Sequence, residues 1–200
     1  MMGKVEELLV ERIRRNGTIH LTLIDPEKID AKDAADIVRF AEEAGTAGTM
    51  IGGSTLISVY QLDSVVKEIK SISRIPAILF PNDVTGISEY ADAIFFMSLL
   101  NSSNPRYIIE AQALGAPLVK RYGLETIPLG YLIVGENTGA AGYIGHARAI
   151  PSHKPELAAM YALAAQYLGM RFVYLEAGSG ARKPIRPEMI RTVKNSLDIP

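Results

Sequence analysis

The sequence predicts an α/β fold with a parallel sheet, and we expect a (β/α)8 TIM barrel. Short, almost continuously apolar runs recur along the 200 residues, and segments with helical periodicity separate them. Strands of this kind are typical of parallel sheets, because both faces of such sheets are covered. Each run also ends in polar residues or glycines. Barrels and open parallel sheets alike build their sites at the carboxyl ends of their strands.

The predicted strands follow one another along the chain. Residues 18–24 form the first, which ends at Asp25 because the proline after it cannot continue a strand. Asp30 is predicted to cap the following helix, which ends at Gly45. The other five strands are predicted at residues 49–51, 77–80, 93–97, 130–134 and 172–175.

The number of β-α units is smaller than a complete barrel needs. A barrel of about 250 residues spends roughly 30 on each unit, so the 200 residues hold fewer than eight. Residues 197–200 are interpreted as the approach to a seventh strand, after a helix that contains Met189 and Val193. We therefore expect one barrel domain over residues 1–200, with the last two β-α units missing from the sequence.

The charge balance and the lack of cysteine exclude several classes of function. The sequence has 21 basic and 22 acidic residues, so its net charge does not attract nucleic acid or an anionic membrane. Without cysteine there is no disulfide, iron–sulfur cluster, thiolate zinc site or cysteine nucleophile. No signal peptide is predicted, and the apolar residues 157–165 fall short of the roughly 20 that span a bilayer. We expect a cytoplasmic protein without a membrane span.

Asp25 is the first candidate site residue, because it directly follows the first predicted strand. A carboxylate at this end of a strand can hold Mg²⁺ together with the phosphates of a substrate. An aspartate before proline is also a common turn or N-cap residue. The sequence leaves both roles open.

A second candidate is Gly52-Gly53-Ser54-Thr55, between a strand and a helix expected to begin near Leu56. Its glycines permit close approach, and its backbone N–H groups and hydroxyls can bind an anion or its metal. The segment matches neither the phosphate loop of nucleoside triphosphatases nor the GxGxxG fingerprint. A helix cap with flexible glycines is the alternative.

Glu176 is the strongest candidate for a catalytic residue. It follows the apolar run FVYL, which contains Tyr174, and precedes Gly178-Ser179-Gly180, whose backbone can form a phosphate nest. A carboxylate in this place is suited to act as a general base. A structural glutamate at the rim of a barrel is the alternative, but packing does not account for glycines on both sides of Ser179.

Other polar residues are weaker candidates. Turn chemistry accounts for four of them at strand ends, which are Asn82, Asp83, Glu136 and Asn137. The three histidines lack metal-ligand spacing: His20 is expected within a strand, and His146 and His153 in a loop. A histidine zinc site is therefore not predicted.

Five motifs together resemble the geranylgeranylglyceryl phosphate synthase family. In chain order they are HLTLIDPEK at 20–28, MIGGST at 50–55, ILFPNDVTGIS at 78–88, GYLIVGE at 130–136 and YLEAGSG at 174–180. The IDPEK form is similar to the second group of that family. The resemblance covers nearly the whole chain.

The resemblance implies a (β/α)8 prenyltransferase of archaeal ether lipid synthesis. Its substrates would be geranylgeranyl diphosphate and sn-glycerol 1-phosphate, and its products geranylgeranylglyceryl phosphate and diphosphate. It also implies a homo-oligomer, a dimer or a hexamer, with transient membrane contact for the lipid product. No nucleic acid partner is implied.

The same resemblance assigns roles to individual residues. Asp25 and Ser54 would hold Mg²⁺ against the prenyl diphosphate, and Glu176, with Tyr174, would be catalytic by taking the proton of the attacking hydroxyl. Glycerol 1-phosphate would be bound by Tyr174, Leu175, Glu176, Ala177, Gly178, Ser179 and Gly180. Two departures stand out: the family has lysine where this chain has Leu23, and its last glycine-rich loops follow strands that lie beyond Pro200.

Two other functions remain open from the residues alone. One is a different phosphate-binding barrel enzyme, such as an aldolase or isomerase of a small sugar phosphate. The lack of a strand-end lysine suited to a Schiff base disfavours the aldolase. The other is a truncated barrel that binds phosphate ligands without catalysis. The length of the prenyl chain is not readable from the sequence.

Overall fold

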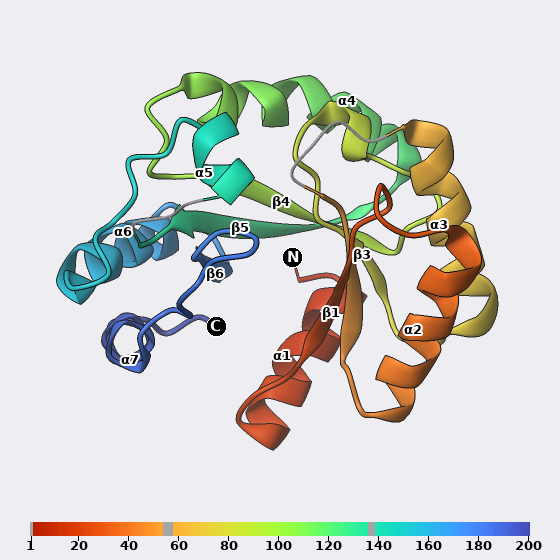
Figure 1. The fold of residues 1–200 in the computed structure, drawn as a ribbon, viewed down its shortest axis with the longest axis horizontal. Coiled ribbons are helices and arrows are strands. Elements are labelled where there is room, and N and C mark those ends of the chain that lie inside the picture. Colours follow the sequence, from red (N-terminus) through yellow and green to blue (C-terminus); the bar gives the residue numbers. More distant parts are fainter. Residues whose placement is uncertain (1, 54–57, 136–138) are drawn as a thin grey trace. The chain divides into compact units, whose positions relative to one another are not determined.

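Two compact units make up the computed structural model, which describes residues 2–53, 58–135 and 139–200 (Figure 1). The first unit comprises Met1–Phe95 and Leu114–Ile127, and the second Phe96–Ala113 and Pro128–Pro200. Strands β4 (Ala93–Leu99) and β5 (Glu125–Ile133) each have residues in both units. The described residues contain six strands, as the sequence predicts.

The first unit is a parallel sheet with helices along it. Its strands β1 (Leu21–Ile24), β2 (Gly48–Ile51), β3 (Ala77–Leu79) and the start of β4 pair in chain order, all parallel. Helices α2 (Ala31–Glu43) and α3 (Val59–Ile72) lie side by side along these strands, in orange and yellow in Figure 1. Every residue of β2 is buried, as expected for a strand covered on both faces. The predicted parallel α/β fold is thereby confirmed.

Two predicted strand boundaries are wrong. The first strand begins at Leu21, so His20 precedes the strand, and its carbonyl accepts bonds from the Ala47 N–H and the Thr46 hydroxyl. β5 begins at Glu125, ahead of the predicted residues 130–134, and contains Pro128. The proline is tolerated because its carbonyl, the one hydrogen-bonding group that its backbone keeps, accepts from the Arg171 N–H at 3.0 Å.

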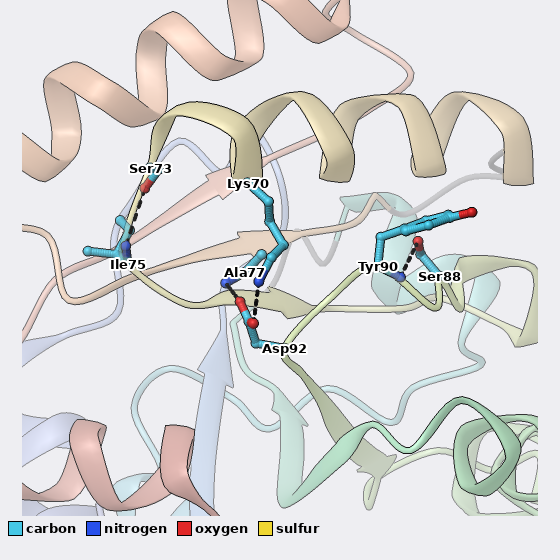
Figure 2. Close-up of polar contacts among 7 residues, drawn as sticks. All are labelled: Lys70, Ser73, Ile75, Ala77, Ser88, Tyr90 and Asp92. Atoms are coloured by element: carbon cyan, nitrogen blue, oxygen red, sulfur yellow. Dashed lines mark hydrogen bonds and ion pairs between the residues drawn. The ribbon is translucent and has the colours of Figure 1, made fainter.

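Side chains fix the ends of these elements. Asp30 caps α2, as predicted, because its carboxylate accepts the Asp33 N–H at 2.9 Å. Figure 2 shows the Asp92 carboxylate between Lys70 at the end of α3 and the Ala77 N–H at the start of β3, which it accepts at 2.9 Å. Asp92 therefore joins the end of a helix to the strand that follows it.

The second unit pairs β5 with β6 (Phe172–Glu176) in parallel. After β4, the Leu100 N–H donates to the Tyr131 carbonyl at 3.0 Å, so the chain that leaves β4 lies along β5. The core contains the buried Leu132, Met189 and Val193. The helical segments not yet named are α4 (Ala111–Tyr122), α5 (Gly139–Ile144), α6 (Pro155–Tyr167), α7 (Pro187–Asn195) and the short η1 (Val84–Gly86) and η2 (Arg106–Glu110).

No helix among the described residues is long and apolar enough to cross a bilayer. The longest, α3, has 14 residues and includes charged side chains.

Helix α1 (Lys4–Asn16) is capped from a distant part of the chain. The Glu125 carboxylate accepts the Val5 and Glu6 N–H groups, both at 2.8 Å. A negative charge at a helix N-terminus also interacts favourably with the helix dipole. Gly3 leaves room for this cap, because a Cβ at Gly3 would overlap the Glu125 side chain.

Replacing Glu125 by alanine is expected to lower the free energy of unfolding by about 1–2 kcal/mol, because two helix N–H groups lose their partner and the favourable charge. Urea denaturation followed by circular dichroism measures the change. Glu11→Ala, in the middle of α1, is the control, and equal stability of the two variants would contradict the cap.

Candidate active site

The predicted site residues fall into two groups, one in each unit. Glu176 and the loop after it belong to the second unit, at the carboxyl end of β6. Asp25 and Gly53 belong to the first unit, directly after β1 and near the end of β2. Both groups therefore lie at strand ends, where the sequence predicts them.

Three side chains share one face of the second unit. In the β5–β6 register Tyr131 lies beside Tyr174, and Ile133 beside Glu176. Because side chains alternate along a strand, Tyr131, Tyr174 and Glu176 point to the same side. The two tyrosine rings are 5.5 Å apart between centroids and are inclined by 35°.

The Glu176 carboxylate is held by neighbours. Its Oε1 accepts the Gly178 N–H at 2.5 Å, and the Tyr131 hydroxyl hydrogen-bonds to the same carboxylate. Its backbone carbonyl accepts the Val134 N–H at 2.8 Å, so the strand below the side chain is also fixed. The result is a half-buried, oriented carboxylate, which is the geometry that a general base requires.

Both tyrosines are kept neutral. Burial, and then the charge of Glu176, raise the pKa of Tyr131 far above its ordinary value. The same two causes raise the pKa of Tyr174. Burial disfavours the charged phenolate, and a nearby carboxylate repels it. Each phenol therefore remains a hydrogen-bond donor over the physiological range.

Tyr131 is a candidate site residue that the sequence did not identify. It lies within the motif GYLIVGE, yet nothing in that motif shows that it faces Glu176. The register between β5 and β6 determines this, since a shift by one residue would turn Tyr131 to the other face.

A titration checks the state of Tyr131. Phenolate absorbance at 295 nm should show Tyr131 ionising only above about pH 10, the ordinary pKa of a tyrosine. Because the pKa of Tyr131 is raised in the folded state, its contribution to stability is fully present below about pH 10 and is lost as the pH rises further. The difference between wild type and Tyr131→Phe isolates the signal, and a difference centred near pH 10 would contradict the burial.

The glycine-rich loop after Glu176 needs its glycines for backbone conformation. Gly178 has φ 100° and Gly180 has φ 72°, a region that side chains with a Cβ avoid. The loop also lies against Gly139, where a Cβ would be 3.0 Å from the Ser179 nitrogen. Ser179 is exposed, so its hydroxyl and the neighbouring backbone are accessible to a ligand.

The two remaining predicted residues of this loop have different surroundings. The Leu175 side chain packs against the buried cluster that includes Leu132 and Val134, on the face of β6 opposite to Glu176. Only its backbone is available to a ligand on the Glu176 side. Ala177 is half-buried and joins the strand to the loop.

In the first unit the Asp25 carboxylate has two partners. Its Oδ2 is 2.7 Å from the Lys28 ammonium, and its Oδ1 accepts the Glu27 N–H at 3.2 Å. The hydrogen bond and the charge of Asp25 raise the pKa of Lys28. Asp25 is thus partly the turn residue that the sequence allows, although the turn occupies Oδ1 alone.

The two glycines near Asp25 let neighbouring groups come close to the backbone. A Cβ on Gly53 would lie 2.6 Å from the Asp25 Oδ1, and one on Gly52 would overlap the Phe80 carbonyl. The alternative of a helix cap with flexible glycines is wrong for α3, because the N-cap of that helix is Ser58. The Phe80 backbone excludes a side chain at Gly52, whereas a side chain at Gly53 would require the Asp25 carboxylate to move. Ser54 and Thr55 lie outside the described residues, as does Leu56, and α3 begins at Val59.

A magnesium ion shared with a substrate fits the donors at Asp25. Across residues 2–53, 58–135 and 139–200, no group of three or more acidic, histidine or cysteine side chains could hold a metal. Mg²⁺ commonly keeps several waters and uses one or two carboxylates together with substrate phosphates. The half-buried Asp25, whose side chain is 17% exposed, matches that smaller requirement.

The weaker candidates behave as turn residues or cannot be placed. Asp83 caps η1 by accepting the Val84 N–H at 2.7 Å. Glu136 and Asn137 lie outside the described residues. His146 has φ 51° and its ring stacks on Tyr107 at 6.3 Å, which is a structural contact.

The chain matches known proteins over its whole length. A family model described as the PcrB family matches residues 10–199. The geranylgeranylglyceryl phosphate synthases of Pyrococcus abyssi and Thermococcus kodakarensis are each 54% identical over 199 residues, covering 100% of this chain and 79% and 78% of theirs. The crystal structure of the Thermoplasma acidophilum enzyme in complex with its substrate sn-glycerol-1-phosphate is 42% identical, with a TM-score of 0.92 over 100% of this chain and 80% of that one. The chain therefore belongs to the PcrB family, in agreement with its resemblance to the geranylgeranylglyceryl phosphate synthases.

Proposed function

We propose that this protein is a prenyltransferase that joins geranylgeranyl diphosphate to sn-glycerol 1-phosphate. The products are geranylgeranylglyceryl phosphate and diphosphate. The observation that carries the proposal is the oriented Glu176 carboxylate beside two neutral tyrosines, in a chain whose relatives are geranylgeranylglyceryl phosphate synthases. The structure of a relative with sn-glycerol-1-phosphate supports the choice of acceptor.

The reaction needs one bond to form, one to break and one proton to move. The glycerol hydroxyl oxygen bonds to the first carbon of the prenyl group, and the bond from that carbon to the diphosphate breaks. The hydroxyl proton passes to Glu176. The Gly178 N–H and the Tyr131 hydroxyl hold the carboxylate in position for this transfer.

The loop after Glu176 binds the acceptor in this proposal. Residues 174–180 present the Tyr174 hydroxyl, the backbone of Leu175 and Ala177, and the exposed Ser179 to glycerol 1-phosphate, while Gly178 and Gly180 shape the loop. Positive φ at Gly178 and Gly180 turns successive N–H groups, which is how backbone nests bind phosphate.

In the first unit, Asp25, together with Ser54, would hold Mg²⁺. The ion would supply positive charge that stabilises the leaving diphosphate. Asp25 is oriented for this by the Glu27 N–H on its Oδ1, and Gly53 leaves space at the same oxygen. Lys28 lies at the other oxygen and is available to a phosphate when Asp25 takes up the ion.

The proposal extends to the fold and the partners. The domain is a single (β/α)8 barrel, to which the described residues contribute six parallel strands. The Val173 N–H of β6 donates to the Pro200 carbonyl at 3.0 Å, which supports a further parallel strand at that edge. The protein works in the cytoplasm as a homo-oligomer, with transient contact to the membrane that receives its product.

Incubation of the purified protein with geranylgeranyl diphosphate, labelled sn-glycerol 1-phosphate and Mg²⁺ tests the function. An organic-extractable labelled ether phosphate is expected, with none formed after chelation by EDTA. Substituting sn-glycerol 3-phosphate is the matched control for the acceptor. A folded protein that forms no ether product from these substrates would overturn the proposal.

A further inference from the structure

A basic cleft lies in the first unit, at the end of β1 opposite to Asp25. It has a volume of about 590 Å³ and is bounded by the end of α1, the start of β1 and the turn between α2 and β2. From His20 at the cleft to Asp25, the extended chain spans roughly 16 Å. The cleft is therefore separate from the proposed metal site.

The lining of this cleft carries positive charge and no acid. Arg12, Arg15 and His20 line it, with the polar Asn16 and Thr18. None of the described carboxylates pairs with Arg12 or Arg15. The two acidic residues at the end of α2 bind other groups: Glu42 accepts from the Ser73 hydroxyl, and Glu43 pairs with Arg39.

The His20 ring has a defined orientation. The buried Thr46 hydroxyl lies 2.7 Å from the His20 Nδ1, 3.0 Å from the His20 carbonyl oxygen and 3.3 Å from the Thr22 hydroxyl. When this hydroxyl donates to Nδ1, the neutral ring carries its proton on Nε2, because a neutral imidazole has one donor and one acceptor nitrogen. The Nε2–H is then a donor for a phosphate oxygen.

Arg12 is held by the same threonine. Its Nη1 donates to the Thr46 carbonyl at 3.3 Å, and the other guanidinium N–H groups are not used by that bond. One buried residue thus positions an imidazole and a guanidinium side by side. Arg15, one turn further along α1, adds a second guanidinium.

Helix dipoles do not cancel this charge. Helices α1 and α2 both end beside the cleft, and each C-terminus carries roughly half a negative charge. Two guanidinium groups supply two full positive charges against about one negative charge in total. The balance favours an anion, even with His20 neutral.

We propose that this cleft is a second anion site, which binds a phosphoryl group through Arg12, Arg15 and His20. Guanidinium groups form paired hydrogen bonds with phosphate oxygens, and a positioned imidazole adds a third direction of contact. The volume exceeds that of a phosphate, so the group can belong to diphosphate or to the head of an anionic lipid. The site stands independently of the proposed prenyl transfer.

The test observes the site directly in the full chain. Histidine labelled with ¹⁵N gives signals for three imidazoles, and His20→Asn identifies that of His20. Inorganic phosphate at millimolar concentration and constant pH should shift the His20 signal and leave those of His146 and His153 in place. Arg15→Gln should raise the apparent Kd about tenfold, because one charge-assisted contact is lost.

Arg14→Gln is the matched control, because Arg14 adjoins Arg15 in the last turn of α1 and does not line the cleft. Its Kd should stay within about twofold of wild type, since it removes the same charge from the helix end. Arg12→Gln should weaken binding as well. If Arg12→Gln fails to fold without its bond to Thr46, Arg15→Gln still tests whether the cleft binds an anion.

Two further arms separate the sources of the phosphoryl group. Inorganic diphosphate is titrated in the same way, and co-sedimentation is measured with vesicles of phosphatidylglycerol and phosphatidylcholine against phosphatidylcholine alone. Binding of diphosphate or of the anionic vesicles would support the site if Arg15→Gln weakens it and Arg14→Gln does not. The ligand that shows this pattern identifies the source of the phosphoryl group. A His20 signal that none of these anions moves, or equal effects in the two arginine variants, would overturn it.

Discussion

Replacing Glu176 by glutamine is expected to lower kcat for ether formation by about 10²- to 10⁴-fold, the usual contribution of a positioned base. Glutamine keeps the shape of the side chain, and its amide oxygen can still accept the Gly178 N–H, but it cannot take a proton at neutral pH. The KM for glycerol 1-phosphate should change much less than kcat, because the loop after residue 176 remains intact. Initial rates at saturating prenyl diphosphate measure both constants.

Glu188→Gln is the control for this variant. Glu188 is exposed in the first turn of α7, in the same unit, and has no part in the proposed site. Its rate should match wild type, and thermal unfolding should show that both variants are folded. A Glu176→Gln enzyme with wild-type kcat would exclude Glu176 as the base.

The Asp25→Asn variant is expected to lose about 100-fold in activity, equivalent to about 3 kcal/mol of transition-state stabilisation. The amide retains the Glu27 N–H contact on its oxygen but lacks the charge that attracts a divalent cation. The variant should also need a higher Mg²⁺ concentration for half-maximal rate. Rates across a Mg²⁺ series measure this requirement.

The matched control for Asp25 is Asp36→Asn. Asp36 lies on α2 of the same unit, where its exposed carboxylate pairs with Arg39 at 3.2 Å. Exposed pairs of this kind contribute little, so neither rate nor Mg²⁺ requirement should change. If Asp25→Asn retains the wild-type Mg²⁺ response, the ion is bound elsewhere.

Local patterns in the sequence were sufficient for the elements and for the candidate positions. The apolar runs predicted six parallel strands, and the Asp30 cap of α2 was predicted from its place before an amphipathic segment. Asp25 and Glu176 were found because a strand ends beside each of them. These features depend on residues close together in the chain, where spacing and residue type carry the information.

The predicted strand boundaries were less accurate where a residue has its hydrogen-bond partner far away in the sequence. β5 begins at Glu125 and continues through Pro128, a residue that local rules assign to a strand edge or a turn. The Pro128 carbonyl accepts the Arg171 N–H, a partner distant in the sequence. The carboxylate of Glu125 in turn caps α1, some 120 positions earlier. No pattern within a short window predicts such a contact.

The chemistry around the candidate residues was decided by the same long-range pairing. Strand periodicity assigns Tyr131 to a face of β5 and Leu175 to the face of β6 opposite to Glu176, but only the register between the strands brings the Tyr131 hydroxyl to Glu176. Gly53 lies against the Asp25 carboxylate, and Thr46 contacts both Arg12 and His20 at the cleft. Residue types along the chain determined which groups could react or bind. The packing of distant segments determined which of them meet, because hydrogen bonds, burial and charge act through space.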